Sequence, residues 1–297
     1  MKKFPIALLV TLLITITNGF ASQIIEANGM IFSTDQQAPT LSCGESAVFP
    51  YSDEAAVLLE IASKIKESRG KEFSIVIDPF CGDGKSGLPI VFHQIAEKLQ
   101  GSDLNIRAIQ YAKENAQLNH LKTKSCFSVR DIIKEGLVSS DSPGNTLWIA
   151  NPPFALKAKG SDLELMRDGG ENGLRLTIAF AGQALAISQP GDVILGIGYS
   201  RIRTNSSLEL EEELNRAIAN HGGTLEVILL EGQKLWRDYQ GNKQQNNPMP
   251  ITEEIFALKA DPSNPEESNA YRTAAQFHNK AGFNKLGYYA YIIYKGY

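Results

Sequence analysis

The sequence contains few of the residues from which metal centres and disulfide frameworks are built. Three cysteines and four histidines occur among its 297 residues. Cys43, Cys81 and Cys126 are odd in number and irregularly spaced, which matches neither a disulfide framework nor a zinc site. The histidines are scattered and form no pattern of metal ligands. We therefore expect a chain without a metal cofactor.

An excess of positive charge is also missing. The net charge is −4, the isoelectric point is near 5.7, and 21% of the residues are charged. Proteins that bind DNA or long RNA usually carry a basic surface, so the composition counts against such a partner unless a local basic patch exists. The length and the 43% of hydrophobic residues are enough for one large α/β domain or two small ones.

Long apolar runs are rare, and the clearest one lies at the N-terminus. A short basic start precedes an apolar run over residues 4–16 and small residues around Ala21. This pattern predicts a signal peptide over residues 1–21, with export to the periplasm or secretion, and then an irregular segment over residues 22–46. The run is too short to span a bilayer comfortably, so we expect no stable membrane insertion after cleavage. The alternatives are a buried strand, an uncleaved anchor, or translation from Met30, which would leave the protein in the cytoplasm.

The rest of the chain alternates between strand-like and helix-like segments. Short β-branched runs predict strands, and amphipathic runs predict helices. This alternation is typical of a mostly parallel sheet covered by helices on both faces, so we expect a Rossmann-like, doubly wound α/β fold. The expected strands cover residues 73–77, 127–129, 146–150, 192–197, 224–230, 254–259 and 288–294, and a further strand, the second in order, is expected to end at residues 101–105. The expected helices cover 55–65, 87–99, 108–118, 173–188 and 208–220.

Residues 77–87, IDPFCGDGKSG, follow the first of these strands and suggest three cofactors. A nucleotide triphosphate loop also ends in Gly-Lys-Ser, but it needs a glycine where this chain has Pro79, whose missing N–H would weaken a phosphate cradle. A dinucleotide-binding turn agrees with the three glycines and with Asp103 near the expected ribose position, and it stays open as an alternative. It gives no role to Asp78, the acid at the end of the strand.

A third cofactor, the methyl donor S-adenosylmethionine, gives each acid a role. Asp78 can anchor its ammonium group, and the glycines let the backbone pass close to it. Asp103 ends the second strand and can accept from both ribose hydroxyls, whereas Asp131 follows the third and can accept from the adenine amino group. Strand ends form the ligand edge of open α/β sheets, although capping a helix or turn is the ordinary role of each acid taken alone. The expected donor-binding residues are Asp78, Phe80, Gly82, Gly84, Asp103, Leu104, Asp131 and Ile132.

Residues 151–154, Asn-Pro-Pro-Phe, follow the fourth expected strand. The nitrogen of an amide or aromatic amine is planar and its lone pair is delocalised, so methyl transfer to it requires alignment. The Asn151 side-chain oxygen and the Pro152 carbonyl can accept its two N–H bonds, while the consecutive prolines hold the backbone still. Phe154 offers a flat face for stacking. We expect Asn151, Pro152 and Phe154 to be the catalytic residues; the alternative is that the prolines merely end a strand.

Together these motifs resemble those of class I S-adenosylmethionine-dependent methyltransferases. The resemblance is carried by DPFCGDG, GSDLNIRAIQYAKENAQLNHL, VRD and NPPF. Residues 168–174, DGGENGL, look like the branch that contains HemK-type protein-glutamine and rRNA guanine-N2 methyltransferases. This resemblance implies a seven-stranded, mostly parallel sheet and a methyltransferase domain over residues 47–297. It also implies N-methylation of a planar amino nitrogen, either a protein glutamine amide or a nucleobase exocyclic amine.

The sequence leaves the methyl acceptor, protein or nucleic acid, unidentified. Residues 232–285 match no motif and are expected to form an insertion over the acceptor site. Lys157, Lys159, Arg201 and Arg203 could contact an anionic acceptor, although a solvated charged surface is their ordinary role. Two other functions stay open. One is an exported binding protein that keeps the fold without turnover, and the other is an enzyme delivered into another cell, where the donor is present.

Overall fold

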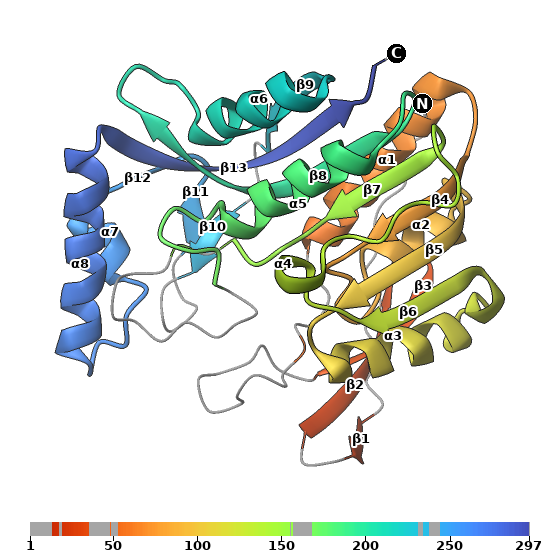
Figure 1. Ribbon diagram of the computed structural model, residues 1–297. Helices are drawn as coiled ribbons and strands as arrows, with labels where there is room; N and C mark the ends of the chain where they lie inside the picture. The colour runs from red at the N-terminus through yellow and green to blue at the C-terminus, as the bar shows by residue number, and fades with distance from the viewer. Residues whose placement is uncertain are drawn as a thin grey trace, which may run out of the picture. The chain divides into compact units, whose positions relative to one another are not determined.

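The computed structural model describes residues 14–17, 20–35, 48, 53–154, 156, 168–230, 234–237 and 244–296. The chain divides into two compact units, Met1–Asn151 and Pro152–Tyr297. Figure 1 shows the elements of both units, and each unit is described by itself.

The first unit is built on four parallel strands. Their order is β7 (Thr146–Ala150), β4 (Phe73–Asp78), β5 (Ala96–Asp103) and β6 (Ser125–Val129), and β4 pairs with both β5 and β7 (Figure 1). All five residues of β7 are buried, as expected of a strand in the middle of an α/β sheet. The predicted strands 73–77, 127–129 and 146–150 are confirmed.

Helices connect these strands. They are α1 (Asp53–Arg69), α2 (Gly87–Phe92), α3 (Ile106–Leu118) and α4 (Ile132–Glu135), with a 3₁₀ turn at Lys122–Lys124. α2 packs on β4 and β5, and α3 packs on β5 and β6. The predicted helix over residues 87–99 is wrong in its second half. Gln94 has a positive φ of 56°, which ends the helical turn, and the next residues pair with β4 as a strand despite their helix-forming composition.

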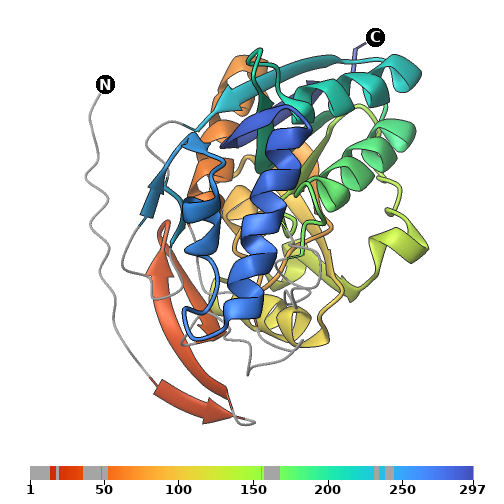
Figure 2. The same ribbon diagram turned by 90° about the vertical axis from the view of Figure 1, so that its left-hand side faces the viewer.

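A three-stranded antiparallel sheet precedes this core. It consists of β1 (Ile14–Thr17), β2 (Phe20–Ala27) and β3 (Met30–Asp35), and Figure 2 shows it in red. The expectation of an irregular segment over residues 22–46 is therefore wrong for its first half. Asn28 and Gly29, with φ of 52° and 74°, form the tight turn of a hairpin, which is a strong signal for paired strands.

The predicted signal peptide lies largely outside the described residues. Its described part includes β1, which pairs with the start of β2. Pairing of β2 with β3 begins at Ser22, so cleavage after Ala21 would leave that hairpin whole. Within the described residues, each helix is too short or too polar to cross a membrane.

The second unit is organised around one long strand. β13 (Phe283–Tyr294) pairs antiparallel with β8 (Val193–Arg203), β9 (Thr224–Leu229) and the short β12 (Met249–Pro250). The predicted strands 192–197, 224–230 and 288–294 are confirmed as β8, β9 and β13, and β12 is an additional strand. The α/β fold predicted from the sequence is thus confirmed.

The other elements of the second unit are mostly helical. α5 (Arg175–Ile187) and α6 (Glu209–His221) confirm two predicted helices. α7 (Glu253–Ala257) replaces the predicted strand 254–259, because the Thr252 hydroxyl caps a helical turn there at 3.2 Å from the Ile255 nitrogen. The segment 232–285 also contains β10 (Lys234–Arg237), β11 (Gln244–Asn246) and α8 (Pro265–Lys280), and α8 packs on α7 (Figure 2).

A buried polar cluster ties α6 and α8 to β8. The Arg201 guanidinium donates to the Glu209 carboxylate, with 2.6 Å between Nε and Oε2, and lies 2.8 Å from Nδ1 of His278. Since a guanidinium can only donate, Nδ1 of His278 accepts and the ring is neutral. Burial, and then the charge of Arg201, lower the pKa of His278 to about 4.

We predict that this cluster makes the free energy of unfolding depend on pH. Between pH 6.5 and 4 the unfolded chain protonates His278 and the native chain does not, so stability falls as the pH decreases across that window, by up to about 3 kcal/mol. Urea unfolding at pH 7, 5.5 and 4.5 measures this. His278→Gln keeps an acceptor for Arg201 and should flatten the dependence, and equal slopes in both proteins would contradict the prediction.

Candidate functional site

Four polar residues lie where the parallel strands of the first unit end. Asp78 and Asp103 are the last residues of β4 and β5, Asp131 lies two residues beyond β6, and Asn151 directly follows β7. Because these strands are parallel, their carboxyl ends lie at the same edge of the sheet, and Figure 1 shows the arrows of β5, β6 and β7 pointing the same way. This is the edge at which open α/β sheets bind ligands.

Asp78 is a strongly perturbed acid at this edge. Its side chain is fully buried, and its Oδ1 accepts from the Phe80 backbone N–H at 3.3 Å. Its Oδ2 is buried without a hydrogen-bond partner among the described residues. Burial raises the pKa of Asp78 to about 8, opposed by the Phe80 N–H and reinforced by the Asp103 carboxylate. A buried carboxylate oxygen without a donor matches a cationic donor group such as an ammonium.

The two glycines of the loop after β4 have different surroundings. Gly84 has a φ of +88°, and a Cβ there would lie 2.6 Å from the Leu88 side chain, so only glycine is accommodated. Its N–H donates to the Cys81 carbonyl at 2.8 Å. At Gly82, by contrast, an added Cβ would meet nothing within 4 Å. The backbone at Gly82 therefore borders open space, as a loop that lies against a ligand requires.

Asp103 fastens this loop to the end of β5. Its Oδ2 accepts from the Gly82 N–H and its Oδ1 from the Asn105 N–H, each at 2.9 Å. Burial raises the pKa of Asp103, and the two amides oppose this shift. A carboxylate can accept about four hydrogen bonds, so two backbone bonds leave room for the two hydroxyls of a ribose. Leu104, the next residue, exposes 46% of its surface beside this carboxylate.

Asp131 has a simpler role in the structure. It is the N-cap of α4, and its Oδ1 accepts from the backbone nitrogens of Ile133 at 3.0 Å and Lys134 at 3.3 Å. Its Oδ2 pairs with the Lys134 ammonium at 3.2 Å. Burial, which raises its pKa, is outweighed by the lysine and the two amides, so the pKa of Asp131 is lowered. The helix-capping alternative is observed here, and contact with an adenine amino group stays a prediction, as it does for the buried Ile132.

The sequence analysis missed two charged residues of the glycine loop. Asp83 is fully buried and Lys85 nearly so, and they flank Gly84. Burial raises the pKa of Asp83, and the Lys85 charge lowers it. The same lysine also opposes the raised pKa of Asp78 and of Asp103. The unusual Asp-Gly-Lys sequence was the available signal, but it suggested a triphosphate loop rather than a charge cluster.

The Asn-Pro-Pro-Phe segment spans the boundary of the two units. Asn151 is half-buried and ends the first unit. Pro152 is buried and begins the second unit. Phe154 joins an aromatic cluster, with ring centroids 4.7 Å from Tyr199 and 5.6 Å from Tyr288. Tyr199 and Tyr288 face each other across β8 and β13.

A glycine-rich loop surrounds the backbone of Phe154. At Gly169 an added Cβ would lie 2.6 Å from the Phe154 Cα, and at Gly173, which has a φ of +76°, it would lie 2.7 Å from the Phe154 carbonyl oxygen. The Asp168 and Asn172 side chains hold the loop by accepting from the backbone nitrogens of Gly170 at 2.8 Å and Leu174 at 3.0 Å. The DGGENGL motif thus encloses the aromatic end of Asn-Pro-Pro-Phe.

The basic residues suggested for an anionic acceptor are already paired. Arg201 is buried against Glu209, and Arg203 donates to both carboxylate oxygens of Glu212 at 3.2 Å. Lys157 and Lys159 lie outside the described residues. Among the residues that are described, no group of histidine, cysteine, aspartate or glutamate side chains could hold a metal ion.

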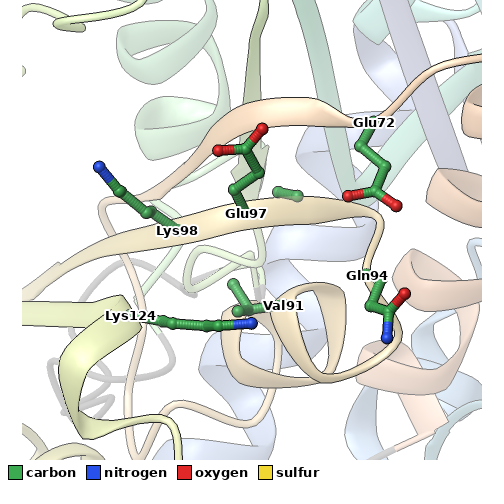
Figure 3. A pocket seen from close by; sticks show the side chains of 7 residues that line it. Glu72, Val91, Gln94, Glu97, Lys98 and Lys124 are labelled. Carbon is green, nitrogen blue, oxygen red and sulfur yellow. The ribbon is translucent and has the colours of Figure 1, made fainter.

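A shallow pocket of about 410 Å³ lies at the other end of the first unit's strands. It is located where β5 begins, so it is remote from the carboxyl edge that carries the acids. Figure 3 shows its charged lining, which comes from the start of β5 and the segments around it. Its lining residues are Glu72, Val91, Gln94, Ala96, Glu97, Lys98 and Lys124.

We predict that Asp78 destabilises the free protein at neutral pH. Its native pKa of about 8 exceeds the unfolded value near 3.8, so stability is lost as the pH rises from about 4 to 8. Asp78→Asn removes this ionisation and should stabilise the protein by about 1–3 kcal/mol at pH 8 but little at pH 4. Chemical unfolding at both pH values measures this, and Asp168→Asn serves as a half-buried control. A stability gain that is equal at the two pH values would contradict the prediction.

Comparisons with known proteins establish the fold. No family model and no curated protein matches the chain. Solved structures do match. The tRNA m1G37 methyltransferase of M. jannaschii is 14% identical with a TM-score of 0.51, over 93% of this chain and 57% of that one. "M. jannaschii TYW2 in complex with AdoMet" is 13% identical with a TM-score of 0.50, over 94% and 89% of the two chains. The chain therefore has the Rossmann-like fold of class I methyltransferases.

Proposed function

We propose that the chain is an S-adenosylmethionine-dependent N-methyltransferase that acts on an exocyclic amine of a nucleobase. The observation that carries this proposal is the carboxyl edge of the first unit. There, an Asp78 oxygen that is buried without a donor among the described residues, an open glycine loop and the half-buried Asn151 lie at the ends of neighbouring parallel strands. The known structures with this fold include a tRNA methyltransferase, and another of them, TYW2, was solved in complex with AdoMet.

The donor would be held by residues of the first unit. Asp78 is suited to the ammonium, because the positive charge would satisfy its buried Oδ2 and favour its ionised form. Asp103 would accept from the ribose hydroxyls with the lone pairs that Gly82 and Asn105 leave free. Phe80 and the exposed Leu104 lie next to these acids in the chain and would contribute apolar surface. When bound, the donor supplies an electrophilic methyl group on its sulfonium.

The acceptor nitrogen would be aligned by Asn151 and Pro152. The Asn151 side-chain oxygen and the Pro152 carbonyl would accept the two N–H bonds and so favour tetrahedral geometry at the nitrogen. Both acceptors are positioned by a buried strand on one side and by proline rings on the other, so little reorganisation is needed. Phe154, supported by Tyr199 and Tyr288, would stack on the planar group.

A nucleobase suits this arrangement better than a glutamine amide. The aromatic cluster around Phe154 provides a stacking surface, which single-stranded nucleic acids use and an aliphatic glutamine does not. The neighbour from M. jannaschii with a TM-score of 0.51 is a tRNA methyltransferase. The net charge of −4 provides no overall attraction to phosphate, so we expect a weakly salt-dependent interaction with a short or exposed segment of RNA.

Export is a separate proposal, and it favours the second candidate function. If residues 1–21 are cleaved, the mature chain begins at the first β2 residue that pairs with β3, and the hairpin is kept. An exported chain would meet little donor unless it enters another cell, so it could be a binding protein without turnover. N-terminal sequencing of the mature protein tests cleavage after Ala21, and an intact N-terminus would exclude it.

We predict that Asn151→Ala separates methyl transfer from donor binding. Loss of one aligning acceptor should lower kcat by about 100-fold or more, while the affinity for S-adenosylhomocysteine changes less than about threefold. Isothermal titration and single-turnover transfer measure the two quantities. Asn145→Ala is the control for general destabilisation, because the Asn145 side chain bonds Ser74 at the start of β4, the opposite end of that strand from Asp78. Equal losses of affinity and transfer would mean that Asn151 is structural.

A second prediction concerns the acceptor. With labelled donor and a cell lysate, the label should appear in RNA and be lost on nuclease but not on protease treatment. Mass spectrometry of the digested nucleosides should then locate it on an exocyclic amine. Label in protein on a glutamine side chain would replace the nucleobase proposal with the amide alternative. Binding of S-adenosylhomocysteine without label in any fraction would favour the binding protein.

A further inference from the structure

Side chains along one face of α3 form hydrogen bonds with alternate residues at the edge of β3 that does not pair with β2. Tyr111 and Arg107 bond Asp35, Asn115 bonds Ser33, and Asn119 bonds Ile31. The partners on the helix are four residues apart and those on the strand are two apart. Four helical residues advance about 6 Å and two strand residues about 6.7 Å, so the two periods nearly coincide. The side chains of α3 thereby close a strand edge that would otherwise be unpaired.

The two asparagines bond the strand in the same way. The Asn115 Oδ1 accepts from the Ser33 N–H at 2.6 Å, and its Nδ2 donates to the Ser33 carbonyl at 3.0 Å. The Asn119 Oδ1 accepts from the Ile31 N–H at 2.8 Å, and its Nδ2 donates to the Ile31 carbonyl at 2.6 Å. Each side chain thus replaces a neighbouring strand at one residue of β3.

The two asparagines differ in their remaining bond. Asn115 is fully buried, and its Nδ2 also donates to the Asp83 carbonyl at 2.8 Å, in the middle of the glycine loop. The second bond of the Asn119 Nδ2 goes to the Asn115 carbonyl within α3, at 2.8 Å. The loop receives a further bond from β3, because the buried Thr34 hydroxyl bonds the Asp83 carboxylate.

We infer that Asn115 is a positioning residue for the donor loop, and that β3 is part of the donor site rather than a separate N-terminal extension. The loop has positive φ at Gly82 and Gly84, so its own backbone preferences do not hold it in one conformation. Asp103 fixes it at Gly82, and Asn115 fixes it at Asp83. The donor-binding half of this inference rests on the proposed function, whereas the conformational half does not.

Amide hydrogen exchange of the full chain tests the conformational half without any ligand. In Asn115→Ala the amides of Gly84 and Lys85 should exchange about tenfold faster than in the wild type, because a buried hydrogen bond to the loop is lost. Asn119→Ala loses the same pair of bonds to β3 but none to the loop, so it should leave these two amides within about twofold. Equal acceleration in both variants, or in neither, would overturn the inference.

Titration with S-adenosylhomocysteine tests the donor half. Asn115→Ala should weaken binding about tenfold with kcat nearly unchanged at saturating donor, and Asn119→Ala should bind like the wild type. If Asn115→Ala does not fold, Thr34→Val removes the other bond to Asp83 and should also accelerate exchange at Lys85; unchanged exchange there overturns the inference. A wild-type protein that fails to bind the ligand refutes the proposed function, and the exchange comparison still decides the role of Asn115.

Discussion

The parallel pairing of β4 with β5 on one side and β7 on the other is the constraint on which the candidate site depends. Pairing in this direction places Asp78, Asp103 and Asn151 at one edge, although they are far apart in the sequence. β7 is buried throughout and β4 is buried at four of its six residues, so their register is fixed by the hydrophobic core rather than by the polar residues at their ends. The polar residues at this edge can therefore lower the stability of the protein without changing how the strands pair.

This loss of stability is electrostatic, and it arises from acids in and beside the glycine loop. Three carboxyl groups with raised pKa values, those of Asp78, Asp83 and Asp103, surround the buried Lys85. Burial keeps Asp78 largely protonated at neutral pH, and one of its oxygens has no partner among the described residues. A cationic ligand would favour the ionised form of Asp78 and supply the missing hydrogen bond. Strain of this kind is what distinguishes a binding site from a helix cap such as Asp131.

The sequence predicted the strands and their polar ends better than it predicted the connections. The limits of β7 were predicted correctly, because an apolar run is closed by Asn-Pro-Pro. The second half of the helix at 87–99 was wrong because pairing with β4 overrides helix propensity in a short segment. The Asn28-Gly29 turn was a readable hairpin signal that was overlooked. The bond from Asn115 to Asp83 was not readable, since it depends on how α3 packs against the loop.

The two prolines after Asn151 also set where β7 stops. Neither Pro152 nor Pro153 has a backbone N–H, so neither can extend the hydrogen-bonded ladder, and the strand ends at Ala150. Successive side chains of a strand point to opposite faces of the sheet. The residue at which β7 ends therefore determines the face toward which the following side chain, Asn151, points. A single residue inserted between Ala150 and Asn151 would lengthen the strand by one step and turn the amide toward the other side of the sheet. The number of residues in β7 is therefore constrained by the site, just as their types are constrained by burial in the core.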